Sequence, residues 1–120
     1  MKDFRDLQVW QKAHHLALQV YLVTKSFPKD ELYSLTSQLR RSTVSVPSNI
    51  AEGCGREGDA ELARFLQIAM GSASEAEYQI ILARELGYLP TNDANELISS
   101  FQEVKRMISG LLRRLRNTDR

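Results

Sequence analysis

Histidine and cysteine are the residues of this chain best suited to metal binding or nucleophilic chemistry. His14 and His15 are adjacent, so on a helix they cannot face one metal as a pair four residues apart would. Neither follows a glutamate by three residues, so the Glu-x-x-His element of di-iron bundles is absent. Cys54 has no CxxC partner, and no nucleophile–base arrangement can be assigned. We expect no enzyme, metal or cofactor, and we interpret His14 as a packed interface histidine.

The single cysteine also bears on the compartment. Cys54 cannot form an internal disulfide, which favours a reduced cytoplasmic thiol over an intermolecular bridge or a reactive site. The first residues are charged and polar, and no stretch approaches the ~18 apolar residues of a membrane span. We therefore expect a cytoplasmic protein without a membrane partner.

Basic residues concentrate at the end of the sequence. Residues 1–103 carry ten Lys/Arg against fourteen Asp/Glu, a net of −4, whereas residues 104–120 carry six against one, a net of +5. Arg113, Arg114 and Arg116 are candidate contacts to the phosphates of RNA or DNA. The alternative is that they complement the negative end of a helix dipole.

Arg40 and Arg41 form a second candidate phosphate contact. Adjacent residues on a helix point about 100° apart, so only one of them can face a given groove. Contact with a neighbouring subunit and an ion pair with Glu52 or Glu75 are the alternatives.

Four amphipathic segments should position these residues. The periodicity predicts helices over about 6–26, 31–55, 59–86 and 92–116 within a single domain, residues 1–120. The last segment is the clearest, because its apolar residues alternate steps of three and four: Ala94, Leu97, Phe101, Val104, Ile108, Leu111 and Leu115. Short connections favour an all-α, up-and-down antiparallel four-helix bundle.

The second segment contains a local conflict, since Pro47 follows a run of β-branched residues. No other run could pair with a strand there, so we expect a Pro-kinked helix whose nearby hydroxyls satisfy the freed carbonyls. Asn49 and Glu52 are expected on the inner side of the kink as a polar packing cluster, and Gly53 near the end of the helix.

Gly71 lies mid-helix in the third segment, where close approach of another helix would explain it.

The first segment is apolar over too wide an arc. One stripe holds Val9, Ala13, Leu16, Val20, Val23 and Phe27, and a second holds Leu7, Trp10, His14, Ala17 and Tyr21. A core-facing stripe needs only about 100° of arc, and this face covers roughly twice that. We interpret the excess as a subunit interface containing Trp10, Ala17 and Tyr21.

The stretch from Gln38 to Gly53, QLRRSTVSVPSNIAEG, is too particular to be generic bundle sequence. Together with LQVWQKA at 7–13, Phe27-Pro28 and AMGS at 69–72, it closely resembles the four-helix bundle family of 23S rRNA intervening-sequence proteins. The resemblance implies an up-and-down bundle that associates into a homopentameric ring. It also extends to the accessory protein of diversity-generating retroelements, which partners a reverse transcriptase and nucleic acid.

Two hypotheses follow. The first is a non-enzymatic homo-oligomer, pentameric by resemblance, that binds RNA or DNA through basic surfaces. The second is a protein-interaction adaptor or scaffold, in which the arginines contact a protein such as a reverse transcriptase.

Overall fold

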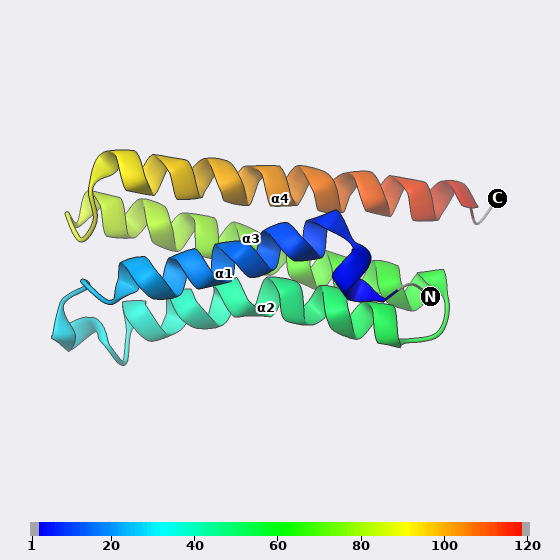
Figure 1. Ribbon diagram of the computed structural model, residues 1–120, viewed down its shortest axis with the longest axis horizontal. Helices are drawn as coiled ribbons and strands as arrows, with labels where there is room; N and C mark the ends of the chain where they lie inside the picture. Colours follow the sequence, from blue (N-terminus) through cyan, green and yellow to red (C-terminus); the bar gives the residue numbers. More distant parts are fainter. Residues whose placement is uncertain (1–2, 119–120) are drawn as a thin grey trace.

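Four antiparallel helices make up the bundle, and the start of the first helix and the end of the last helix lie at the same end of it (Figure 1). The computed structural model describes residues 3–118, and no strand occurs among them. The helices are α1 (Gln8–Thr24), α2 (Leu35–Gly55), α3 (Asp59–Glu85) and α4 (Thr91–Thr118). Each packs against its sequence neighbours, and α1 also contacts α4. The predicted all-α four-helix bundle is confirmed.

The core follows the apolar periodicity. In α1, the predicted stripe is buried apart from Val23, which is half-buried. In the last turns of α4, the buried side of the helix differs slightly from the predicted apolar stripe: Leu112 is buried, whereas Leu111 is half-buried. Alanines of α3 are completely buried, so small residues line the side of α3 that faces the core: Ala69, Ala73, Ala76 and Ala83.

The connection before α2 differs from the expected helix start near residue 31. Residues Lys29–Glu31 form a separate 3-10 turn, and the Glu31 carboxylate accepts hydrogen bonds from the Ser34 hydroxyl and the Leu35 backbone N–H. The Tyr88 hydroxyl donates to the other Glu31 oxygen at 2.7 Å, which ties this connection to the loop between α3 and α4. The hydrogen bonds from Ser34, Tyr88 and Leu35 lower the pKa of Glu31.

Pro47 is buried inside α2, which runs unbroken from Leu35 to Gly55. The nearby hydroxyls were expected to satisfy carbonyls freed by the proline, but two of them link α2 to α3 instead. Ser42 Oγ lies 2.6 Å from Gln79 Oε1, and Ser45 Oγ lies 2.9 Å from Ser72 Oγ. Buried Thr43 Oγ1 has no hydrogen-bond partner among the described residues. The polar residues around Pro47 thus fix the pairing of two helices.

The close helix approach occurs at Gly53 and not at Gly71. A Cβ atom added at Gly53 would lie 2.9 Å from Phe65 Cβ and 3.0 Å from a methyl of Leu62, both on α3. A Cβ atom added at Gly71 would meet nothing within 4 Å, because this glycine is exposed. The expectation for Gly71 was therefore wrong within this chain, since α3 turns Gly71 away from its neighbours.

Candidate nucleic-acid interface and assembly surface

Cationic side chains line a groove of about 620 Å³ between α3 and α4. It is lined by Met70, Ser74, Gln102, Lys105, Arg106, Ser109 and Arg113. Lys105 Nζ lies 2.8 Å from a Glu77 carboxylate oxygen and 3.3 Å from Ser74 Oγ, so its charge is partly neutralised. Arg106 and Arg113 form no ion pair with any described carboxylate. We call this surface the basic groove.

The three arginines predicted near the end of α4 do not share one face. Arg113 lines the basic groove, whereas Arg114 lines a groove of about 380 Å³ between α1 and α4. Arg116 is exposed. Arg106 borders both grooves and was not singled out from the sequence. Only the overall charge asymmetry pointed to it, because which α4 side chains meet α3 depends on how the helices pack. Arg120, counted in that asymmetry, lies outside the described residues.

Arg40 and Arg41 lie in the first turns of α2, at the opposite end of the bundle from the last turns of α4 (Figure 1). Arg40 Nε donates to Thr24 Oγ1 at 2.8 Å, and its guanidinium lies 4.7 Å from the centre of the Tyr21 ring. Arg40 therefore holds α2 against the end of α1.

The alternative considered for Arg40 and Arg41, an ion pair with Glu52 or Glu75, does not occur among the described residues. Glu52 pairs with Arg56 at 2.8 Å, and a Glu75 oxygen accepts from Gln79 Nε2 at 3.4 Å. Arg41 is exposed and borders a small polar groove between α2 and α3 that also includes Glu75. Neither arginine of this pair joins the basic groove.

The expected polar cluster at Pro47 includes Asn49 but not Glu52. Asn49 is half-buried, and its amide donates to the Ser45 carbonyl at 2.8 Å and lies 2.9 Å from Ser45 Oγ. Since Ser45 also contacts Ser72, Asn49 supports the link between α2 and α3. Glu52 is exposed, so its placement on the inner side of α2 was wrong.

A second surface is almost entirely apolar. It is a groove of about 390 Å³ between α1 and α2, here called the apolar groove, lined by Phe4, Trp10, His14, Ala17, Leu18, Tyr21, Val44, Pro47, Ser48 and Ala51. The second apolar stripe expected on the first helix lies largely here, outside the core. Ala17 is buried at the floor of the groove, whereas Tyr21 remains exposed.

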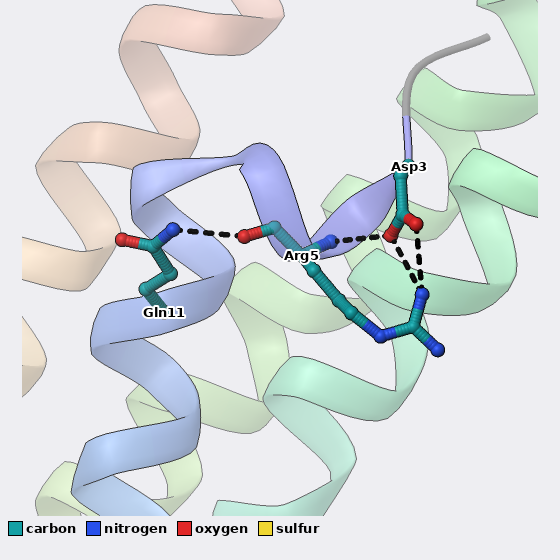
Figure 2. Close-up of polar contacts among 3 residues, drawn as sticks. All are labelled: Asp3, Arg5 and Gln11. Carbon is teal, nitrogen blue, oxygen red and sulfur yellow. Dashed lines mark hydrogen bonds and ion pairs between the residues drawn. The ribbon is translucent and has the colours of Figure 1, made fainter.

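The N-terminal residues complete one side of the apolar groove. A short 3-10 turn, Phe4–Asp6, is fastened by Asp3, whose carboxylate pairs with Arg5 at 2.8 Å, and by Gln11, whose amide donates to the Arg5 carbonyl at 2.8 Å (Figure 2). The Phe4 ring consequently packs edge-on against Trp10, with ring centres 4.9 Å apart.

Residues suited to catalysis are scattered. His14 stacks on Trp10 with ring centres 4.9 Å apart, and His15 is exposed on another side of α1. Cys54 is buried, and its burial raises the pKa of the thiol, which disfavours the reactive thiolate. No group of three or more potential metal-ligating side chains occurs among residues 3–118.

The family model of the 23S rRNA-intervening sequence protein matches residues 5–110. The chain belongs to this family. The resemblance carried by the Arg40–Gly53 region and the tryptophan segment is thereby confirmed. No match was found among curated proteins.

A crystal structure from Bacteroides thetaiotaomicron has the same fold. It is described as a protein with unknown function from the S23 ribosomal protein family. The two chains share 21% sequence identity with a TM-score of 0.80, over 88% of this chain and 95% of the other. Family membership and this neighbour establish the bundle but indicate no enzymatic activity. None of the helices in the described part of the chain has the length and apolarity needed to cross a membrane.

Proposed function

We propose that this family member is a non-enzymatic, homo-oligomeric cytoplasmic bundle that binds RNA or DNA through the basic groove. The observation that carries the proposal is that Arg106 and Arg113 lie along one side of a groove and that neither forms an ion pair with a carboxylate among residues 3–118. They are seven residues apart, two helical turns or about 10 Å along α4. A phosphate backbone lying along α4 could contact both.

The surroundings support a sequence-independent mode of binding. Residues 104–118 of α4 contain no acidic side chain, and the exposed Arg116 adds to the positive potential beside the groove. No aromatic residue lines the basic groove, so it offers no platform for base stacking. Phosphate contacts are therefore the main source of affinity.

Assembly would multiply this effect. The apolar groove, with Trp10 and Tyr21, is the proposed subunit interface, and the family resemblance favours a pentamer. Each copy would repeat the basic groove, so the phosphate contacts of one bound strand would add.

The test is the salt dependence of binding to unrelated RNA and DNA oligonucleotides, measured by fluorescence anisotropy. Arg106→Gln/Arg113→Gln should weaken binding to all sequences and reduce the magnitude of the slope of log K against log salt. The matched control is Lys25→Gln/Lys29→Gln, which removes the same charge from exposed residues beyond the other end of α1. No binding at low salt, or equal loss in both variants, would contradict the basic-groove proposal. In that case, the adaptor function, with a protein such as a reverse transcriptase as partner, becomes the better account.

A further inference from the structure

Two exposed apolar surfaces are not covered by any other part of the chain between residues 3 and 118. One is the apolar groove, where Leu18 and Tyr21 project and are 57% and 45% exposed. The other lies on the outer side of α3, where Ile68 is 42% and Tyr78 is 58% exposed, with exposed Gly71 between them. The α3 residues follow helical steps of three and four through Ile68, Gly71, Glu75 and Tyr78, so they form one stripe. We call it the α3 stripe.

We propose that the α3 stripe of one copy docks into the apolar groove of a second copy. This inference rests on the proposed assembly and identifies the other half of its interface. A contact between two different surfaces is heterologous, so a pair of copies keeps one free groove, on one copy, and one free stripe, on the other. Such a contact continues from copy to copy until the rotation closes a ring.

The heights of the two surfaces along the bundle agree. Arg40 of α2 contacts Tyr21 of α1, and Ser42, only two residues later, contacts Gln79 of α3. Tyr21 and Tyr78 are therefore at nearly the same height. Because α1 and α3 run in the same direction (Figure 1), the roughly 15 Å from Tyr78 back to Ile68 parallels the roughly 16 Å from Tyr21 back to Trp10. Rotation about an axis parallel to the bundle brings the two surfaces together without a shift.

This register gives Leu18 a place to insert. Three residues before Tyr21, Leu18 is level with the space enclosed by Gly71, Ser74, Glu75 and Tyr78, which is the four-residue hole that accepts a knob in helix packing. The absence of a side chain at Gly71 opens this hole, and nothing in its own chain would contact a Cβ there. No contact within the described chain requires a glycine at position 71, whereas the proposed contact between copies does.

Charges at the proposed contact are complementary. Arg40 lies over Tyr21 at one end of the apolar groove and forms no ion pair with a described carboxylate. Glu75 lies within the α3 stripe, and among the described residues its carboxylate accepts a hydrogen bond only from the amide of Gln79. In the proposed register, these opposite charges lie within a turn of each other along the axis. Pairing between copies would favour the parallel arrangement.

Cross-linking tests the contact directly. Two variants are made in a Cys54→Ala background, one carrying Leu18→Cys and the other Ser74→Cys, and the chains are mixed, allowed to exchange subunits and treated with a short bismaleimide. We expect a covalent dimer in the mixture and none from either variant alone. Gln19→Cys, which replaces an exposed residue on the α4 side of α1, is the control for position and should not cross-link to Ser74→Cys.

Light scattering separates failure of this inference from failure of the proposed assembly. Tyr78→Glu should convert the oligomer to monomer, whereas Tyr33→Glu, at a residue 92% exposed outside the α3 stripe, should leave the assembly intact. A monomeric unsubstituted protein would overturn the assembly itself. An oligomer that survives Tyr78→Glu without the mixed cross-link would overturn the α3 contact alone. Self-cross-linking of the Leu18→Cys variant would indicate an isologous interface instead.

Discussion

Replacing Gly53 by alanine probes the closest contact between α2 and α3. The new Cβ would lie 2.9 Å from Phe65 Cβ, and that atom cannot rotate away because it is fixed to the α3 backbone. Relief requires the helices to separate, and overpacking of this kind typically destabilises a core by about 1–3 kcal/mol. Alanine also gains about 1 kcal/mol in helix propensity over glycine. The net expectation is a loss of up to about 2 kcal/mol.

Gly110→Ala is the matched control. In α4, an added Cβ at Gly110 would meet only guanidinium nitrogens of Arg113 and Arg114, at 3.8 and 3.9 Å. These are ordinary contacts with flexible side chains, so the propensity gain should remain and the variant should be about 1 kcal/mol more stable than the parent.

Urea denaturation followed by far-ultraviolet circular dichroism measures both free energies of unfolding. It should be repeated at several protein concentrations, because assembly couples to folding. The two variants should differ by about 1–3 kcal/mol, with Gly53→Ala the less stable. If both substitutions stabilise the protein equally, the argument that Gly53 is required for helix approach is refuted.

Three further predictions follow from the other surfaces. Trp10→Ala should reduce the assembly to smaller species in light scattering while leaving helical content largely unchanged, since Trp10 is only partly buried at the edge of the core; an unchanged mass would remove Trp10 from the interface. Tyr88→Phe should lower stability most above pH 4.5, because its hydroxyl helps to lower the pKa of Glu31 below the ordinary value of 4.5. The difference from the parent in denaturation curves should shrink as the pH falls through the lowered pKa, and a difference independent of pH would contradict this role. For oligonucleotide binding, the double substitution Arg106→Gln/Arg113→Gln should reduce the salt slope by about 1–2 per engaged subunit, depending on whether the nucleic acid is single- or double-stranded, whereas an unchanged slope would exclude both residues as phosphate contacts.

Much of the fold could be predicted from local patterns in the sequence. Steps of three and four in the apolar residues predicted four helices, because a helix must bury one face and that face repeats with the helical period. The same logic identified an excess of apolar arc on the first helix, and the structure shows the surplus as the apolar groove. The distinctive region from Arg40 to Gly53 was sufficient to indicate the family.

Contacts between helices were decided only by tertiary structure. Gly53 and Gly71 look alike in the sequence as glycines of helical segments, yet only Gly53 meets another helix. Arg40 appeared available for phosphate or a carboxylate, but the packing of α2 on α1 directs it to Thr24 and Tyr21.

The basic surface shows the same division. The sequence by itself determined that the last segment of the chain is strongly basic, because charge is a property of composition. Which arginines share a groove depends on the rotation of α4 against α3 and α1, which is set by the packing of the whole core. Helical geometry already points Arg113 and Arg114 to different sides and places Arg106 on the side of Arg113; the rotation decided that the Arg113 side borders α3 and the Arg114 side borders α1.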